Sequence, residues 1–346
     1  MPSMKHPQVR VAVVQSAPVF LDVDATIDKC IALIKQAARD GAQLIAFPET
    51  FIPGYPWFIW LDSPAWGMQF IQAYRDNSLQ IGDLGYQRLA AAARAARIHA
   101  VLGFSESAGG SLYMAQALID PSGDTVFTRR KLKPTHVERS VFGEGAGNDL
   151  VVVNTDCGRV GALCCWEHLQ PLSKYAMYAQ DEQIHVAAWP SFSLYRGAAF
   201  ALGPEMNTAL SQVYAAEGQC FVLAPCATVS PEMVALMCTD GTKRQLLGAG
   251  GGFARIFGPD GAPIGTPLPE DAEGLLIADL DLGAISLAKC AADPAGHYSR
   301  PDVTRLLLNR SPALRVVEQR QTTFDDAPRF MQVPADESAA NPRVET

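Results

Sequence analysis

The chain has 346 residues, a formal net charge of −8, 48% hydrophobic residues and 18% charged residues. This composition is typical of a soluble globular protein with a sizeable core and excludes a disordered chain. The acidic balance argues against a nucleic-acid surface, because such a surface needs a concentrated basic face and the run 129–131 is too short to supply one. No window approaches the roughly 18 apolar residues of a membrane span, and no signal-peptide core is present.

The eight cysteines show no CxxC spacing, which argues against structural zinc and against a disulfide framework in a chain of this length. We therefore expect a reducing, cytoplasmic setting, with no membrane and no nucleic acid among the partners.

Apolar periodicity and turn residues predict alternating helices and strands early in the chain and hairpins later. Asp24 is expected to cap the first helix. The expected strands are 9–16, 44–47, 100–105, 112–119, 126–131, 150–154, 159–164, 184–188, 220–224, 252–257 and 275–280. The expected helices are 24–39, 64–74, 86–97, 204–217, 231–237 and one beginning at Pro171.

This order of elements suits a mixed sheet covered by helices, in a single domain over residues 1–310 with no evident linker. Residues 311–346 are polar and lack periodicity, so we expect an extended or disordered tail, although it could also wrap a neighbouring subunit.

The stretch 161–171 is the most informative part of the chain. An apolar strand ends at the reactive side chain of Cys165, and a helix is expected a few residues later. A nucleophile on such a strand-to-helix turn lies at the end of a sheet, with backbone N–H groups nearby to receive negative charge. Because side chains alternate along a strand, only one of Cys164 and Cys165 can face that site.

A thiol needs a base or a positive neighbour to act as a nucleophile near neutral pH. His168 is the first candidate base. Glu49 and Lys131 also follow predicted strands, so a carboxylate, an ammonium and a thiol could converge at three strand ends. The alternative to a catalytic site is that Glu49 is a turn residue, Lys131 a solvated surface lysine and Cys165 a buried thiol that packs in the apolar core.

Three blocks occur in the order 47–50 (FPET), 130–138 (RKLKPTHVE) and 164–168 (CCWEH). They resemble the three signature blocks of the nitrilase branch of the carbon–nitrogen hydrolase superfamily. Further similar blocks lie between and after them, so the resemblance covers about residues 9–310. Three ordered blocks are a specific signal.

The resemblance implies that Cys165 is the nucleophile, Glu49 the general base and Lys131 the group that stabilises developing negative charge. Lys131 is chosen over Lys133 because the family's lysine lies three residues before the proline of its block. Glu138 matches a second glutamate that positions the lysine and the substrate. No metal or organic cofactor is implied.

With Glu49 as the base, Glu167 and His168 are expected to hold the turn by hydrogen bonds, and His136, His185 and His297 to be structural. Cys164, Cys220 and Cys226 are expected to be buried thiols.

The aromatic loop 55–60 follows Glu49 closely, so some of its rings should lie near the site. We expect Tyr55, Trp166 and Trp189 to line a pocket that could hold an arene, whereas Phe58 and Trp60 fit the pocket and the core equally well.

Within the branch, the resemblance is closest to bacterial arylacetonitrilases, which implies hydrolysis of nitriles such as phenylacetonitrile or mandelonitrile to carboxylic acid and ammonia. The alternatives are an aliphatic nitrilase, a cyanide-degrading nitrilase, an amidase of the same superfamily, and a catalytically silent scaffold that kept the fold.

The implied fold is a four-layer α-β-β-α sandwich. The resemblance also implies a homo-oligomer built from dimers that can extend into a spiral or filament, with residues 227–248 and 311–346 as candidate contact segments.

Overall fold

The structure, a computed structural model, describes residues 6–318. Its strands are β1 (Gln8–Ser16), β2 (Leu44–Ala46), β3 (His99–Ala108), β4 (Ser111–Ile119), β5 (Thr125–Arg130), β6 (Phe142–Gly143), β7 (Val152–Thr155), β8 (Gly158–Cys164), β9 (Ile184–Ala188), β10 (Phe221–Ala224), β11 (Cys226–Ala227), β12 (Arg255–Phe257) and β13 (Gly274–Asp281). Its α-helices are α1 (Val23–Arg39), α2 (Phe58–Leu61), α3 (Pro64–Asp76), α4 (Leu84–Ala96), α5 (Pro171–Tyr178), α6 (Pro204–Gly218), α7 (Pro231–Met237), α8 (Gly241–Leu246) and α9 (Gly283–Ala291).

Within residues 6–318 the strands form two sheets rather than the one sheet that the element order alone suggested. The first has the order β11-β1-β2-β3-β4-β5, with β13 also paired to β1 and β6 to β4. The second has the order β12-β10-β9-β8-β7. Both are mixed: β1, β2 and β3 run parallel, as do β8, β9 and β10, whereas the hairpins β3–β4 and β7–β8 are antiparallel.

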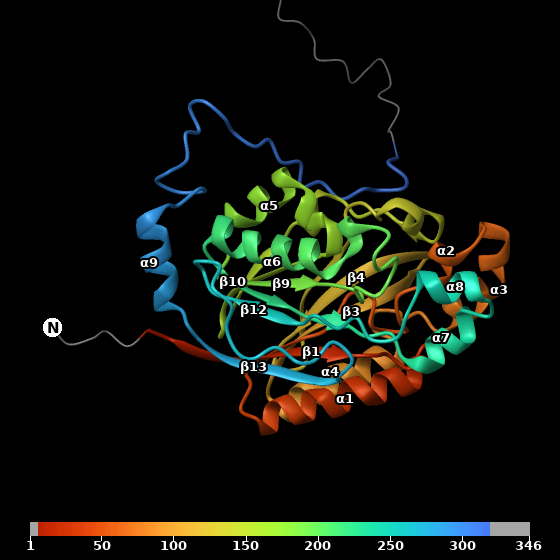
Figure 1. Ribbon diagram of the computed structural model, residues 1–346. Coiled ribbons are helices and arrows are strands. Elements are labelled where there is room, and N and C mark those ends of the chain that lie inside the picture. The colour runs from red at the N-terminus through yellow and green to blue at the C-terminus, as the bar shows by residue number, and fades with distance from the viewer. Residues whose placement is uncertain (1–5, 319–346) are drawn as a thin grey trace, which may run out of the picture. The chain divides into compact units, whose positions relative to one another are not determined.

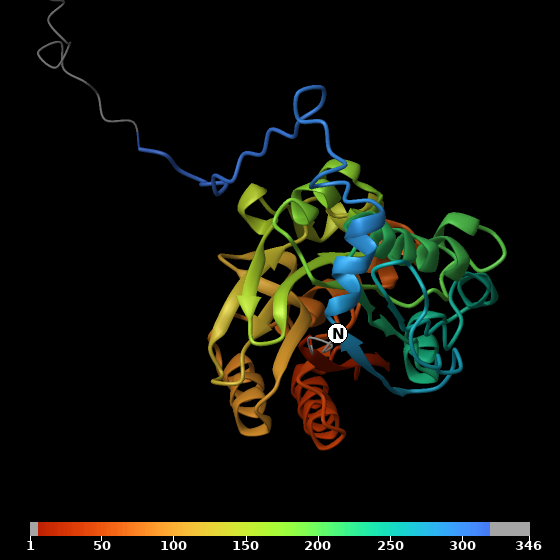
Figure 2. The same ribbon diagram turned by 90° about the vertical axis from the view of Figure 1, so that its left-hand side faces the viewer.

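The elements stack as helix, sheet, sheet, helix (Figure 1). Helices α5 and α6 cover the sheet that contains β9 and β10, and α1 and α4 cover the opposite side of the sheet that contains β1. Figure 2 shows α1 and α4 side by side beneath their sheet. This is the predicted four-layer α-β-β-α sandwich.

Side-chain alternation along β1 explains the layering. Val11 and Val13 pack into the core that also contains the second sheet, whereas Ala12 and Val14 pack against α1 and α4. Because both faces of the middle of the strand are covered, residues 11–14 form an unbroken apolar run, as expected for strands buried on both faces.

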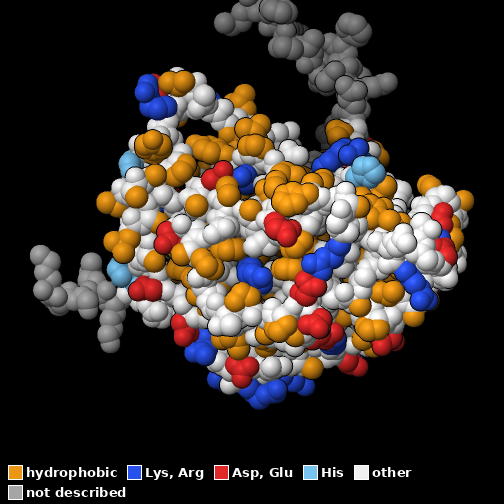
Figure 3. Space-filling model, viewed as in Figure 1, with side chains coloured by type: hydrophobic (Ala, Val, Ile, Leu, Met, Phe, Trp, Pro, Cys, Tyr) orange, Lys and Arg blue, Asp and Glu red, His pale blue; other side chains and the backbone are white. Residues whose placement is uncertain are grey.

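The outer helices α5 and α6 keep some apolar side chains on the surface. Leu172 in α5 is 68% exposed and Val213 in α6 is 45% exposed. Figure 3 shows apolar side chains gathered over this layer of the molecule.

The helix α1 begins earlier than the sequence predicted. Its N-cap is Asp22, whose side chain accepts a hydrogen bond of 2.9 Å from the Ala25 N–H, so the expected cap Asp24 lies in the first turn instead. Both carboxylates favour a helix N-terminus, and the extended backbone of Asp22 decides which of them caps it. The sequence analysis also missed α2, α8 and α9, three short helices with little room for periodicity.

The chain divides into a compact unit, Met1–Pro312, and a second unit, Ala313–Thr346. Residues 313–318 form no helix or strand, and residues 319–346 of the expected tail lie outside the described part of the chain. Among the described helices, none combines the length and apolar character that crossing a membrane requires.

Candidate active site

Glu49 lies three residues after β2 and is fully buried. Its backbone N–H donates to the carbonyl of Trp189, 3.3 Å away, which joins the end of β2 to the chain just after β9 in the other sheet. Gly103 in β3 makes room for this segment, because a Cβ there would lie 2.0 Å from the carbonyl oxygen of Pro48. The backbone around Glu49 is therefore fixed by both sheets.

Lys131 directly follows β5 and is also fully buried. Its backbone N–H donates to the Met114 carbonyl at 2.8 Å. Its Nζ donates to Oε1 of Glu49 at 2.9 Å and to Oε2 of Glu138 at 2.8 Å. The alternative of a solvated surface lysine is wrong for Lys131. It fits Lys133, which is exposed and pairs with Glu144.

Glu138 lies in the short 3-10 helix His136–Ser140 and is 1% exposed. Besides the lysine contact, its Oε2 accepts from the Thr135 N–H at 2.5 Å, and its Oε1 accepts from the hydroxyl of Tyr55 at 2.7 Å. The Trp60 indole donates to that hydroxyl at 3.0 Å. The hydroxyl of Tyr55 therefore helps to hold the Glu138 carboxylate in place.

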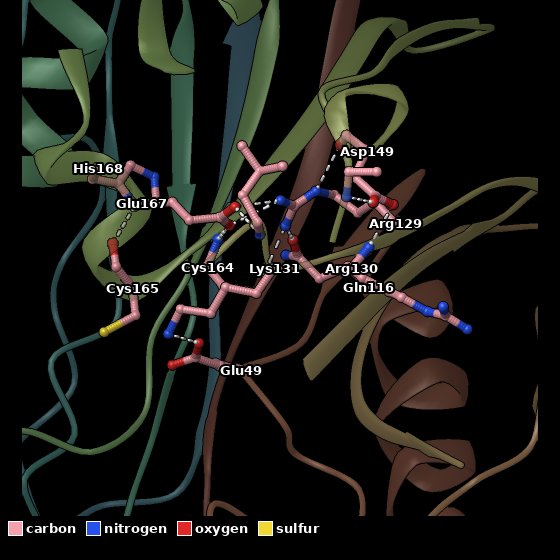
Figure 4. Close-up of polar contacts among 12 residues, drawn as sticks. Glu49, Gln116, Arg129, Arg130, Lys131, Asp149, Cys164, Cys165, Glu167 and His168 are labelled. Carbon is pink, nitrogen blue, oxygen red and sulfur yellow. Dashed lines mark hydrogen bonds and ion pairs between the residues drawn. The ribbon is translucent and has the colours of Figure 1, made fainter. Parts of the chain in front are cut away.

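Cys165 follows β8 and begins the 3-10 helix Cys165–Leu169. Its φ of +47° lies in the left-handed region, which a non-glycine residue adopts only where its surroundings hold it. Figure 4 shows the Cys165 thiol on the side where Glu49 and Lys131 meet, while the side chain of Glu167 extends away from it toward Arg129.

Glu167 fixes this turn from inside the protein, as the sequence analysis expected. Its carboxylate accepts from the backbone N–H of Cys164 at 2.7 Å and of Leu132 at 2.9 Å, so it joins the turn to the segment that carries Lys131. Arg129 donates to both of its oxygens, at 2.6 and 2.9 Å. Sequence reasoning missed Arg129, although alternation along β5 puts it on the same face as Lys131.

His168 does not contact the thiol through an imidazole nitrogen. Its Nδ1 lies 2.6 Å from the carbonyl oxygen of Cys165, and its Nε2 lies 2.9 Å from Nε2 of His185. Both ring nitrogens therefore have other partners, which favours the hydrogen-bonding interpretation of His168 over the general base.

Burial raises the pKa of Glu49 to about 8, and Glu138 adds to the shift while Lys131 opposes it. Burial also raises the pKa of the Cys165 thiol well above its usual range, with Glu49 acting in the same direction. Burial alone would lower the pKa of Lys131, but Glu138 and Glu49 outweigh it and hold the ammonium charged. Two carboxylates therefore share one buried cation beside the thiol, and each adds to the rise that burial causes in the pKa of that thiol.

The thiol opens into a cavity with several aromatic side chains in its wall, which we call the aromatic cavity. It is lined by Tyr55, Trp57, Trp60, Thr135, Glu138, Cys165, Trp166, Trp189, Pro190, Ser191, Phe192, Leu194, Leu202 and Asn207.

The three predicted pocket residues thus reach the aromatic cavity. Trp166 and Trp189 are held by their indole N–H groups, which donate to Asn207 at 2.9 Å and to Ser211 at 2.8 Å. Trp60 lines the cavity, whereas Phe58 stacks on Phe70 in the core. Sequence reasoning missed Asn207, which lies more than 40 residues from Trp166 and carries no local signal.

The remaining expectations concern side chains outside the cavity. Cys164, Cys220 and Cys226 are buried thiols, as predicted. His297 is largely exposed, 3.9 Å from Asp293. No group of three or more metal-ligating side chains occurs among residues 6–318.

The family model for carbon–nitrogen hydrolases matches residues 10–289. The chain belongs to the carbon–nitrogen hydrolase family. It is 64% identical to a nitrilase of Pseudomonas syringae, over 91% of this chain and 94% of the relative. It is 54% identical to an aliphatic nitrilase of Rhodococcus rhodochrous (87% and 82%) and 50% identical to an arylacetone-specific nitrilase of Alcaligenes faecalis (92% and 90%).

Among solved structures, a carbon–nitrogen hydrolase from Helicobacter pylori superposes with a TM-score of 0.67, covering 86% of this chain and 97% of that one at 15% identity. The fold is therefore that of the carbon–nitrogen hydrolases. Together with the nitrilase relatives, the family match confirms the interpretation of the three sequence blocks and the enzyme class, a nitrilase.

The Glu167–Arg129 pair generates a stability prediction. Glu167→Gln removes one partner of a buried ion pair and leaves the guanidinium uncompensated, so the free energy of unfolding should fall by about 3–5 kcal/mol. Chemical denaturation measures it. Glu270→Gln, which breaks a half-exposed pair with Arg196, is the matched control and should cost less than about 1 kcal/mol. Equal losses in the two variants would contradict a structural role for the buried pair.

Proposed function

We propose that this nitrilase hydrolyses arylacetonitriles to carboxylic acids and ammonia, with Cys165 as nucleophile, Glu49 as general base, Lys131 stabilising negative charge and Glu138 positioning the lysine. The observation that carries the proposal is the shared ammonium. Lys131 Nζ bridges Glu49 and Glu138 in a buried site beside a thiol that opens into an aromatic cavity.

The unused hydrogen-bonding capacity of Glu49 and Lys131 fits the proposed reaction. Oε2 of Glu49 is buried and has no hydrogen-bond partner among the described residues, so it is available to accept a proton from the thiol or from water. An ammonium has three N–H donors, and the two glutamates use two of them. The third can meet the nitrile nitrogen as negative charge builds on it.

The reaction then follows in balanced steps. Glu49 takes the thiol proton while the Cys165 sulfur forms a bond to the nitrile carbon, and passes that proton to the nitrogen to give a thioimidate. Glu49 then takes a proton from a water molecule whose oxygen adds to the same carbon and passes it to the nitrogen. The new hydroxyl gives up its remaining proton to the nitrogen as the C–N bond breaks, so ammonia leaves and a thioester remains. A second water cleaves the C–S bond of the resulting thioester, which frees the acid and the thiol.

The aromatic cavity supports the preference for aryl substrates. Trp57, Trp60, Trp166, Trp189 and Phe192 supply ring faces and edges to its wall, which an aryl ring can pack against. The aliphatic nitrilase among the relatives keeps an aliphatic preference as the alternative.

We also propose that the enzyme forms homo-oligomers with a dimer as the building block. The exposed apolar side chains of α5 and α6 support this, because a helical layer that leaves Leu172 and Val213 in solvent offers an apolar face to a second copy.

Ammonia release with product identification tests the proposal, using phenylacetonitrile, mandelonitrile, an aliphatic dinitrile, cyanide and the matching amides. We expect fastest acid formation from the arylacetonitriles, because the aromatic cavity buries their rings. Cys165→Ala should lower kcat by on the order of 10⁴-fold or more. Cys290→Ala, which removes an exposed thiol, is the control and should leave turnover unchanged.

Each other outcome has a definite meaning. Preference for the dinitrile or for cyanide would keep the mechanism and overturn the aryl preference. Turnover of the amides alone would make the chain an amidase. Ammonia release that survives Cys165→Ala would overturn the assignment of the nucleophile.

The raised pKa of Glu49 generates a pH prediction. The base must be ionised to act, so kcat/KM for phenylacetonitrile should rise with pH through the pKa of Glu49. That rise should lie well above the ordinary glutamate value of 4.5. A pH–rate profile of kcat/KM measures it, with circular dichroism at each pH to confirm that the protein stays folded. An acidic limb centred near the ordinary glutamate value would contradict the raised pKa.

A further inference from the structure

A chain of buried polar side chains lies beneath the nucleophile turn and is not used by the proposed mechanism. It begins at the carbonyl of Cys165 and continues through His168 to His185, whose Nδ1 lies 2.8 Å from Oε1 of Glu182. The hydroxyl of Tyr214 donates to the other oxygen of Glu182 at 2.6 Å. All four side chains are at most 2% exposed. His168 lies in the 3-10 helix after β8, His185 in β9, Glu182 just before β9, and Tyr214 in α6.

The direction of each hydrogen bond in this chain follows from its first member. The Cys165 carbonyl can only accept, so the proton on His168 is on Nδ1. A neutral His168 then has a bare Nε2, which must accept from Nε2–H of His185. The Nδ1 of His185 is left to share a single proton with Glu182.

The surroundings agree with this assignment. Burial lowers the pKa of His168 to about 3, with His185 adding to the shift, and burial lowers the pKa of His185 as well. Burial raises the pKa of Glu182 to about 8, against the hydrogen bond from Tyr214. A protonated carboxyl beside two neutral imidazoles satisfies every donor and acceptor in the chain, which a buried polar network requires.

Gly161 in β8 makes the chain possible. A Cβ at this position would lie 2.1 Å from Oε1 of Glu182, so only glycine leaves room for the carboxyl against the strand that leads to Cys165.

The peptide between Cys165 and Trp166 connects this chain to the reaction. In a trans peptide the C=O and N–H point in opposite directions. Because His168 holds the carbonyl toward the interior, the N–H of Trp166 is turned to the opposite side, and it favours the thiolate form of Cys165. A donor on the carbonyl also polarises the peptide and strengthens that N–H as a donor.

We propose that His168, His185, Glu182 and Tyr214 form a positioning chain that fixes the Cys165–Trp166 peptide, so that its N–H faces the negative charge developing at the nucleophile. The proposal rests on the proposed role of Cys165. His168 is a positioning residue in it: the imidazole stays neutral, keeps its proton on Nδ1 throughout the reaction, and takes no proton from the thiol.

The first test compares variants by steady-state kinetics. His168→Ala should lower kcat by about 100-fold, with a much smaller change in KM, because it releases the peptide and keeps every side chain that lines the aromatic cavity, although the His168 ring stacks on one of them, Trp189. His168→Asn should restore most of the lost kcat, since its amide nitrogen occupies the place of Nδ1 and can donate to the same carbonyl. His99→Ala removes another buried histidine, one that contacts Cys157, and should leave kcat unchanged.

The second test reads the tautomers directly in the wild-type enzyme. The wild-type enzyme, labelled with ¹⁵N at its six histidines, should show a neutral Nδ1–H imidazole at His168 and Nε2–H at His185 in long-range ¹H–¹⁵N spectra. The spectra of His168→Asn and His185→Gln assign the two signals. Glu182→Gln should keep both tautomers, because its amide can donate to His185 as the carboxylic acid does.

A proton on Nε2 of His168, a cationic His168, or a kcat of His168→Ala equal to that of His99→Ala would overturn the positioning chain. These results differ from a failure of the proposed function, which would appear as activity in Cys165→Ala. An inactive Cys165→Ala with a fully active His168→Ala would overturn only the positioning chain.

Discussion

The site depends on one buried ammonium shared between two carboxylates. Lys131 balances only one of the charges that Glu49, Glu138 and a Cys165 thiolate could carry, and the burial of these side chains weakens the screening of the remainder by solvent. The neutral thiol with an ionised glutamate and the thiolate with a protonated glutamate therefore carry the same total charge. Transfer of a proton between sulfur and carboxylate would leave the total charge of the site unchanged, as the proposed role of Glu49 as general base requires.

The sandwich brings these groups together because each follows a strand of one of two facing sheets. Glu49 and Lys131 follow β2 and β5 of the first sheet, and Cys165 follows β8 of the second. Two sets of hydrogen bonds connect the sheets at this edge. The Glu49 N–H donates to the Trp189 carbonyl, and the Glu167 carboxylate accepts from the backbone N–H groups of Leu132 and Cys164. Trp189, whose carbonyl belongs to the first set, and Cys165, which adjoins the second, also line the aromatic cavity, so the packing that holds the proposed catalytic groups also shapes the cavity.

Much of this could be predicted from the sequence, because the decisive signals are local. Apolar runs located most of the strands and made Glu49, Lys131 and Cys165 candidates near strand ends, and the resemblance of the three blocks chose them over the alternatives. Other features depend on contacts between distant segments. The sequence did not show which of Trp60 and Phe58 lines the cavity, because that depends on how α2 is oriented: Trp60 faces the cavity and Phe58 packs in the core. Arg129 belongs to a basic run with no burial signal, and only Glu167, 38 residues later, explains its place inside the protein. The chain from His168 to Tyr214 likewise joins residues with no pattern in sequence.

The most direct measurement of the central claim is mass spectrometry of wild-type enzyme quenched in acid while it turns over phenylacetonitrile. The account predicts a covalent adduct, thioimidate or thioester, on the peptide that contains Cys165 and on no other cysteine peptide. Turnover without any adduct, or an adduct confined to another cysteine, would contradict it.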